Sequence, residues 1–301
     1  MNKYMKVFDE QDFVDIRFDE PMSAHTSFKI GGPADVLIRI TSEDELEKAL
    51  RLSREKNVPV FIMGNGSNLL VKDGGIRGVV LKINDGFDHV RIDGDTIYAQ
   101  AGALLTAVSK AALRESLEGL EFASGIPGTI GGAISMNAGA YGGEMKDVVT
   151  LVRAIDKNGI KLQLSGHEME FAYRNSRVKR DDLIVLDVAM KLEKGDYTKI
   201  DEKMKELTDQ RTSKQPLEIP SAGSTFKRPE GYFAGKLIED SGLRGLRHGD
   251  AQVSEKHCGF VVNRGKSTCK EVLELIEVVR KTVRDKFEVE LEMEIKLAGE
   301  D

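Results

Sequence analysis

The sequence predicts an α+β protein built from more than one domain. Short apolar strands and capped helices alternate along most of the 301 residues, and beyond about residue 200 the pattern changes to a charged helix and a proline-containing connection. At about 150 residues per domain, this length allows two domains with substantial cores. The composition, 40% hydrophobic and 31% charged, is typical of a globular protein. A formal net charge of −6 disfavours non-specific nucleic-acid binding.

The first 117 residues predict three strands, a hairpin and two helices. Ser42 and Glu45 have the spacing of a capping box, which begins the first helix. Asp93-Gly94, between alternating apolar residues, is a strong hairpin signal. The strands are expected at 35–40, 58–63 and 78–83, the hairpin at 90–99, and the helices at 43–57 and 104–117.

The rest of the chain predicts a second hairpin and then a helix-rich region. The hairpin turns at Asn158-Gly159, and Thr268 with Glu271 forms a capping box for a long helix. The main boundary is expected near residue 200. The expected elements are the hairpin 149–164, strands at 183–192 and 259–263, helices at 198–213, 232–240 and 268–287, and an alternating closing strand at 289–297.

Several classes of protein are disfavoured by what the sequence lacks. No segment resembles a membrane span or an export signal, so we expect a cytoplasmic protein without membrane insertion. Cys258 and Cys269 cannot form a disulfide framework, and they lack metal-ligand spacing. We therefore expect two ordinary thiols and no metal site.

Two glycine-rich clusters, residues 63–70 and 125–133, are candidates for ligand binding. The second lies in a 22-residue uncharged run, 122–143, that holds seven glycines and one proline. Glycine backbones let successive N–H groups converge on an anion, although such loops also serve simply as tight turns. Neither cluster fits GxGxxG or GxxxxGK[ST], which disfavours a Rossmann site or an NTPase. The lack of charge favours a segment that lines a buried, elongated ligand, whose phosphates the backbone would bind.

Residues 24–35, 64–70, 125–132 and 136–142 resemble the flavin-binding half of the UDP-N-acetylenolpyruvoylglucosamine reductase family. The resemblance extends in order from about Pro21 to Gly299. It implies an FAD-binding domain of the vanillyl-alcohol-oxidase type with two subdomains, 1–84 and 85–200. A smaller α+β substrate-binding domain, 201–301, would follow, and its last strand can return to the first subdomain. It also implies non-covalent FAD, with the cofactor-binding residues Thr26, Ile30, Gly31, Gly64, Asn65, Gly66, Ser67, Asn68, Gly125, Pro127, Gly128, Thr129, Gly131, Gly132, Asn137 and Gly139.

Three further stretches, 171–177, 221–229 and 292–299, match the family's catalytic motifs. By resemblance, Ser224 is the proton donor, and Arg174 and Glu294 are its electrostatic partners. A planar guanidinium suits enolate charge, whereas a serine hydroxyl is a weak acid that needs help from neighbouring donors. From the residues alone, Arg174 reads as surface charge, Ser224 as a turn residue and Glu294 as the polar face of a strand. The expected substrate contacts are Tyr173, Lys214, Lys227, Arg228 and His257.

The resemblance implies NADPH-dependent reduction of the enolpyruvyl ether of UDP-N-acetylglucosamine to UDP-N-acetylmuramate, in peptidoglycan precursor synthesis. Hydride comes from reduced FAD and the proton from Ser224, with NADPH using the substrate pocket in ping-pong kinetics. The chain matches the shorter type, without the tyrosine-loop insertion. One alternative is another FAD-dependent sugar or alcohol oxidase of the same fold, in which His25 could attach the flavin covalently. A second is a non-catalytic nucleotide-sugar-binding protein. No obligate protein partner is expected.

Overall fold

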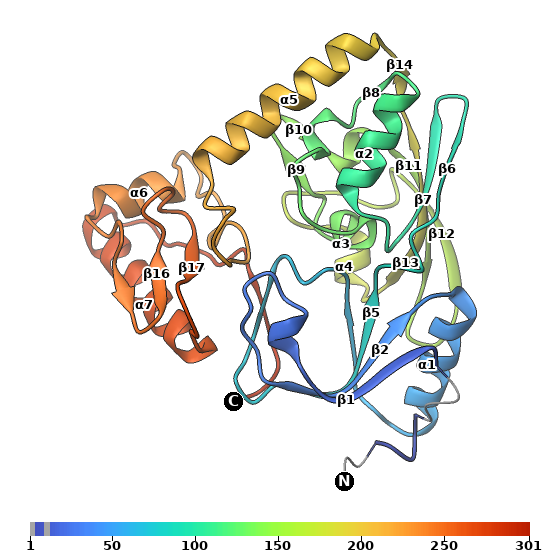
Figure 1. Ribbon diagram of the computed structural model, residues 1–301, viewed down its shortest axis with the longest axis horizontal. Helices are drawn as coiled ribbons and strands as arrows, with labels where there is room; N and C mark the ends of the chain where they lie inside the picture. The colour runs from blue at the N-terminus through green and yellow to red at the C-terminus, as the bar shows by residue number, and fades with distance from the viewer. Residues whose placement is uncertain (1–3, 9–12) are drawn as a thin grey trace. The chain divides into compact units, whose positions relative to one another are not determined.

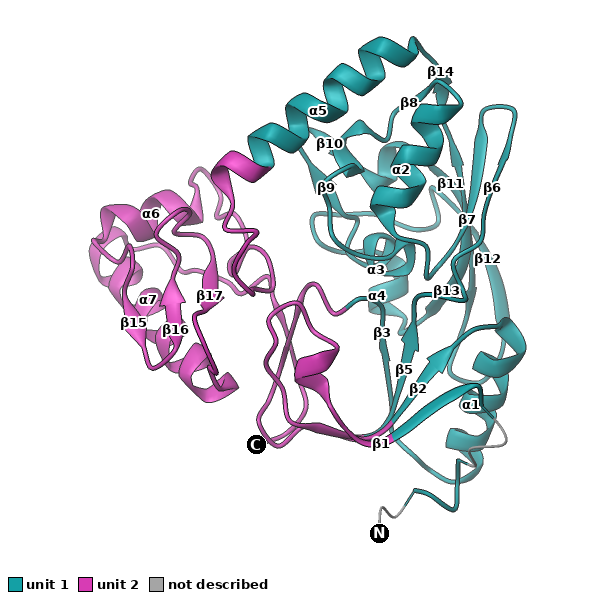
Figure 2. Cartoon of the chain, viewed as in Figure 1, with its two compact units in different colours: residues 1–17, 37–65, 78–211 teal, residues 18–36, 66–77, 212–301 magenta. Residues whose placement is uncertain are grey.

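The computed structural model describes residues 4–8 and 13–301, and the chain forms two compact units, each assembled from three segments of sequence (Figure 2). Unit 1 contains Met1–Arg17, Leu37–Asn65 and Gly78–Arg211, and unit 2 contains Phe18–Val36, Gly66–Arg77 and Thr212–Asp301. The division into domains 1–84, 85–200 and 201–301 stays a prediction.

A five-stranded antiparallel sheet forms the framework of unit 1 (Figure 1). Both predicted hairpins are confirmed, and they are the β6–β7 and β11–β12 pairs. The central strand β13 pairs with β11 and β7, and Val188 and Ala99 are buried where β13 and β7 face each other. In sheet order the strands are β12 (Lys161–Ser165), β11 (Val149–Ile155), β13 (Ile184–Lys191), β7 (Thr96–Gln100) and β6 (Val90–Asp93).

A second sheet has the order β1-β2-β5-β3, with β3 parallel to β5. Its strands include the three predicted in the first 83 residues. The bounds are β1 (Asp15–Pro21), β2 (Pro33–Ile40), β3 (Val60–Met63) and β5 (Ile76–Ile83). Strands β1, β2 and β5 each contribute residues to both units. Two short pairs lie within unit 1: β8 (Leu117–Glu118) with β14 (Glu193–Lys194), and β9 (Gly139–Ala140) with β10 (Gly143–Glu144).

Three of the five α-helices described in unit 1 begin within one residue of the predicted start. Ser42 Oγ accepts a hydrogen bond from the Glu45 N–H at 3.1 Å, as expected for a cap. The Glu45 carboxylate, however, accepts from the N–H and hydroxyl of Thr41, one residue before the predicted partner. The helices are α1 (Glu43–Glu55), α2 (Leu105–Arg114), α3 (Ile130–Ser135), α4 (Arg177–Arg180) and α5 (Tyr197–Lys214), the last of which continues three residues into unit 2.

Unit 2 has its core on one face of the long helix α7 (Cys269–Phe287), whose Thr268/Glu271 capping box is complete. Val272, Ile276 and Val279 on this helix are fully buried in a cluster that also includes Leu70. The other elements are α6 (Ala234–Asp240), the sheet β15 (Arg247–His248), β16 (Ala251–Val253) and β17 (Val261–Asn263), and the parallel pair β4 (Leu69–Val71) with β18 (Lys296–Ala298).

The closing strand differs from the prediction in extent. The expected alternation is present, because Leu291 and Ile295 are buried while Glu290 and Glu292 are exposed. Regular strand pairing is nevertheless confined to β18. The segment changes partners: Met293 bridges Phe226 in antiparallel fashion, and three residues later β18 runs parallel to β4. This change of partner interrupts what the sequence pattern predicts as one strand.

Candidate functional site

In unit 1, the two predicted glycine loops meet. A Cβ atom built on Gly64 would lie 2.2 Å from Thr129 Oγ1, so the loop 125–132 touches the end of β3 at a point that excludes a side chain. Two backbone hydrogen bonds also hold the loop in place: Gly131 N–H donates to the Ala101 carbonyl at 2.8 Å, and Leu105 N–H donates to the Gly128 carbonyl at 3.0 Å. Pro127 and Gly132, by contrast, are exposed. Asn65 is also exposed, and like Gly64 it belongs to unit 1.

Six of the predicted cofactor residues lie in unit 2: Thr26, Ile30, Gly31, Gly66, Ser67 and Asn68. Ser27 N–H donates to the Gly66 carbonyl at 3.2 Å, and the Thr26 hydroxyl donates to the Ile30 carbonyl at 3.1 Å. Gly31 has a φ of 141°, and a Cβ there would lie 2.7 Å from Val71 Cβ. Close packing within the protein is therefore a sufficient reason for glycine at position 31.

Asn137 is engaged by the protein itself. Its side-chain amide donates to Glu144 Oε2 at 2.6 Å and to the Ala172 carbonyl at 3.3 Å, while Oδ1 accepts from Lys146 N–H at 3.0 Å. These bonds connect the end of α3 to the turn that carries Arg174. The geometry therefore favours a positioning role for Asn137. A Cβ atom built on neighbouring Gly139 would lie 2.7 Å from the Gly143 carbonyl oxygen, so the backbone is closely packed there too.

Arg174 lies in a tight two-residue turn closed by Ala172 and Asn175, whose backbones exchange hydrogen bonds of 3.0 and 3.1 Å. Its φ is 54°, in the left-handed region where glycine is the usual residue. The guanidinium lies over the exposed ring of Tyr173, with Cζ 5.0 Å from the ring centroid. Holding an arginine in this conformation costs on the order of 1 kcal/mol, the kind of strain that clusters at functional sites.

In unit 2, the segments that carry Ser224 and Glu294 are paired. Glu294 N–H donates to the Thr225 carbonyl at 2.9 Å, so Glu294 lies beside the residue that follows Ser224. On the other side, Thr225 N–H donates to the Gly259 carbonyl at 2.8 Å and its hydroxyl accepts from Val261 N–H at 2.9 Å. Ser224 and Glu294 are both partly accessible. Buried Thr225 thus fixes the backbone on which Ser224 stands.

Three of the four expected substrate residues in unit 2 lie on or beside the same segment, and Lys214 lies apart from it. Lys227 pairs with Glu292 at 2.7 Å, which lowers the pKa of that carboxyl. Arg228 Cζ lies 4.0 Å from the centroid of the Phe233 ring. His257 Nδ1 accepts from Gly259 N–H at 3.1 Å, and burial lowers the pKa of the imidazole. Lys214 lies at the exposed end of α5.

Two polar groups that the sequence does not single out lie at the start of the loop 125–132. The Oγ atom of Ser124 and the Nε atom of Arg211 are buried, and neither has a hydrogen-bond partner among the described residues. A Cβ atom on Gly125 would lie 2.9 Å from Arg211 Cδ. No local sequence pattern could reveal this, because the contact joins α5 to a loop 86 residues earlier (211 − 125).

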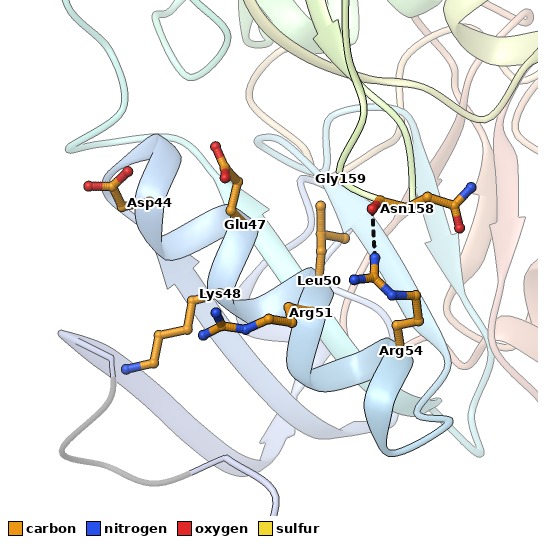
Figure 3. A pocket seen from close by; sticks show the side chains of 8 residues that line it. All are labelled: Asp44, Glu47, Lys48, Leu50, Arg51, Arg54, Asn158 and Gly159. Carbon is orange, nitrogen blue, oxygen red and sulfur yellow. Dashed lines mark hydrogen bonds between the residues drawn. The ribbon is translucent and has the colours of Figure 1, made fainter.

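A polar pocket lies elsewhere in unit 1, between α1 and the β11–β12 turn (Figure 3). One side is closed by Arg54, whose Nη1 donates to the Asn158 carbonyl at 2.7 Å. No predicted site residue lines it. Its lining residues are Asp44, Glu47, Lys48, Leu50, Arg51, Arg54, Asn158 and Gly159.

Metal-ligating side chains do not form a group of three or more anywhere in residues 4–8 and 13–301. Across that same part of the chain, each helix is too short or too polar to span a bilayer.

Comparison with known proteins identifies two families of domain. Residues 34–205 match the FAD binding domain family, and residues 215–298 match the C-terminal domain of UDP-N-acetylenolpyruvoylglucosamine reductase. UDP-N-acetylenolpyruvoylglucosamine reductase of Clostridioides difficile (strain 630) is 54% identical over 287 residues, covering 95% of this chain and 94% of the relative. That of Clostridium perfringens (strain SM101 / Type A) is 52% identical over the whole of both chains.

A solved structure agrees. The crystal structure of UDP-N-acetylenolpyruvylglucosamine reductase from Thermus caldophilus superposes with a TM-score of 0.80 at 35% identity, covering 94% of this chain and 98% of that one. The predicted α+β fold with an FAD-binding domain is thereby confirmed.

The loop geometry fits such a cofactor. Gly64 and the Thr129 loop meet without an intervening side chain, Pro127 and Gly132 are open to a ligand, and buried Ser124 Oγ lacks a partner within the described chain. The residues present can therefore hold an elongated ligand with anionic oxygens. With the relatives matched over nearly their full length, the chain belongs to the UDP-N-acetylenolpyruvoylglucosamine reductase family of FAD-dependent oxidoreductases.

Proposed function

We propose that this enzyme reduces the enolpyruvyl ether of UDP-N-acetylglucosamine to the lactyl ether of UDP-N-acetylmuramate, with NADPH as the electron source. Family membership supports the substrate and the use of FAD. Bound FAD would supply hydride transfer. The proposal assigns the remaining work to the chain's own residues: binding the substrate, stabilising enolate charge and delivering a proton.

The observation that carries this proposal is the backbone arrangement around Thr225. Hydrogen bonds from Glu294 and to Gly259 hold this residue on both sides, so the adjacent Ser224 stands on a rigid segment. A proton donor must be positioned within hydrogen-bond reach of the carbon it protonates, and a rigid support serves that need. In the proposal, Ser224 donates its hydroxyl proton to the substrate carbon next to the carboxylate. Glu294, on the paired segment, helps to orient the reacting groups.

Arg174 is assigned to the enolate. Its guanidinium offers planar, paired donors that match a carboxylate or enolate, and the strained turn fixes where that charge is presented. Nine other non-glycine residues of the described chain share this left-handed conformation, so the φ of Arg174 is compatible with a role for the guanidinium without singling it out.

The covalent-flavin alternative receives less support. His25 is buried, and its Nε2 lies 2.7 Å from Glu20 Oε1, so the imidazole is engaged within unit 2. A non-covalent FAD site is therefore the better proposal. It predicts that flavin separates from the denatured chain on gel filtration.

The test of the proton-donor role is the Ser224→Ala variant, with Ser221→Ala as the matched control in the same segment. Bleaching of bound flavin by NADPH should be nearly normal in both variants. Recovery of the colour on adding the enolpyruvyl substrate should slow by about 10²–10⁴-fold in Ser224→Ala alone, the usual scale for removing a positioned acid.

Ser224→Cys should recover part of the rate, because a thiol is more acidic than a hydroxyl. If Ser224→Ala reoxidises at the rate of the wild-type and Ser221→Ala proteins, Ser224 is a turn residue and does not donate the proton.

A further inference from the structure

Arg211, at the end of unit 1, is a partly buried arginine that has no carboxylate beside it among the described residues. It lies in the last turn of α5, and its Nε is buried without a hydrogen-bond partner among the described residues. Burial lowers the pKa of the guanidinium, and the opposing influence comes from Tyr141, a residue without charge at neutral pH. Partial burial makes an unpaired charge unfavourable, and an anion bound there would offset that cost.

The position of Arg211 indicates which part of the molecule that anion would meet. Its Cδ lies 2.9 Å from where a Cβ of Gly125 would be, so its stem packs against the first glycine of the loop 125–132. The preceding residue contributes the second unsatisfied group, Ser124 Oγ. A guanidinium, a hydroxyl and a glycine backbone together form a donor set suited to phosphate oxygens.

The two domain matches leave this residue unassigned. The FAD binding domain match ends at residue 205 and the C-terminal domain match begins at 215, so Arg211 falls between them. Contact with Gly125 nevertheless places its side chain against the domain that binds FAD.

We propose that Arg211 and Ser124 bind the diphosphate of FAD at the Gly125 end of the loop 125–132. The proposal rests on the FAD binding that family membership establishes, and it identifies the group that neutralises Arg211. Arg211 is then a positioning residue for the cofactor and takes no part in proton or hydride transfer.

The test compares flavins that differ in phosphate content, using apoprotein and quenching of flavin fluorescence. Arg211→Met removes the charge but keeps an apolar stem against Gly125. Its affinity for FAD should fall about 10–100-fold, the scale of one or two lost charge-assisted bonds, while its affinity for riboflavin, which has no phosphate, should not change. Lys205→Met is the control, because Lys205 lies on the exposed side of α5 and pairs with Asp201 at 2.6 Å.

Two results would overturn the proposal. Equal weakening of FAD and riboflavin would show that Arg211 acts on the flavin ring or supports the fold. Unchanged FAD affinity with a raised KM for the enolpyruvyl substrate would show that the substrate's own diphosphate is the partner. Thermal unfolding of the apoprotein checks that Arg211→Met is folded, and its melting temperature should stay the same or rise once the unpaired charge is gone.

A second variant keeps the test decisive if riboflavin binds too weakly to measure. In Gly125→Ala the added methyl group must displace the Arg211 side chain, so FAD affinity should fall with Arg211 still present. In the Arg211→Met background the same change should cost little further affinity, because the group that it displaces is already absent. Fully additive losses would contradict a shared diphosphate site.

Discussion

At the scale of single residues, close packing within the protein explains some of the predicted site residues and leaves others unexplained. Gly31 and Gly139 are explained by close contacts within their own units. Arg174 differs, because its left-handed φ is unfavourable for a residue with a side chain. We propose that an arginine stands in this turn because of what its guanidinium does.

This contrast predicts the behaviour of Arg174→Gly. Relief of the left-handed strain, on the order of 1 kcal/mol, should offset the greater chain entropy of glycine, so the free energy of unfolding should change by less than about 1 kcal/mol. Reoxidation by the enolpyruvyl substrate should nevertheless be severely slowed. Denaturant unfolding together with stopped-flow spectroscopy checks both expectations.

Arg174→Lys is the companion variant, which keeps the charge and loses the planar pair of donors. It too should impair reoxidation by substrate more than reduction by NADPH. Equal impairment of both half-reactions, or a large loss of stability in Arg174→Gly, would assign the residue a structural role.

The environment of His257 leads us to expect that the stability of the protein depends on pH. Burial lowers the pKa of its imidazole below the ordinary value of 6.5, and Nδ1 accepts a hydrogen bond that protonation would break. The unfolded chain therefore binds the proton more readily, and this stabilising contribution, complete above pH 6.5, is lost as the pH falls through the lowered pKa. In His257→Asn, whose amide oxygen can still accept from Gly259, thermal unfolding should show a weaker decline across that range. An identical decline in both proteins would contradict the prediction.

At the scale of elements, the sequence predicted helix caps and hairpin turns best, because neighbouring residues determine them. The capping box of α7 is complete and both hairpin turns fall at the expected residues, because caps and turns are formed by neighbours in sequence. α3 was missed, since its Gly131 and Gly132 disfavour a helix and its stability comes from packing on β13 and β7. The extent of the closing strand was also wrong, because its end depends on a change of partner that no periodicity records.

α3 offers a test of whether the loop 125–132 lies against the cofactor. A Cβ on Gly131 would lie 3.2 Å from Ala101 Cβ, so a large residue there disturbs the protein itself. Gly132 is exposed and has room, with Thr129 Oγ1 3.7 Å away as the nearest atom. Gly132→Ala should stabilise the apoprotein by up to about 1 kcal/mol through helix propensity.

If FAD packs against this surface, the same substitution should weaken FAD binding. Apoprotein melting temperature and FAD titration measure the two effects separately. Stronger helix formation with undiminished FAD affinity would show that Gly132 is remote from the cofactor.

At the scale of the whole molecule, each unit combines segments that are distant in sequence. In unit 2, β18 pairs with β4, and the amide of Asn263 donates to the Phe28 carbonyl at 3.2 Å. Motif resemblance predicted the family, the α+β fold and the cofactor, because those motifs are contiguous. It could not predict that Asn137 supports the Arg174 turn or that Arg211 lies against Gly125, since both contacts depend on how distant segments pack.

The most direct measurement of the proposed activity is the visible spectrum of the purified protein under anaerobic conditions. We expect yellow protein that NADPH bleaches, and whose colour returns on adding one equivalent of the enolpyruvyl ether of UDP-N-acetylglucosamine, with UDP-N-acetylmuramate as product. Colour that returns with oxygen but not with this substrate would indicate a sugar or alcohol oxidase. Colourless protein that takes up no added FAD would contradict flavin-dependent catalysis altogether.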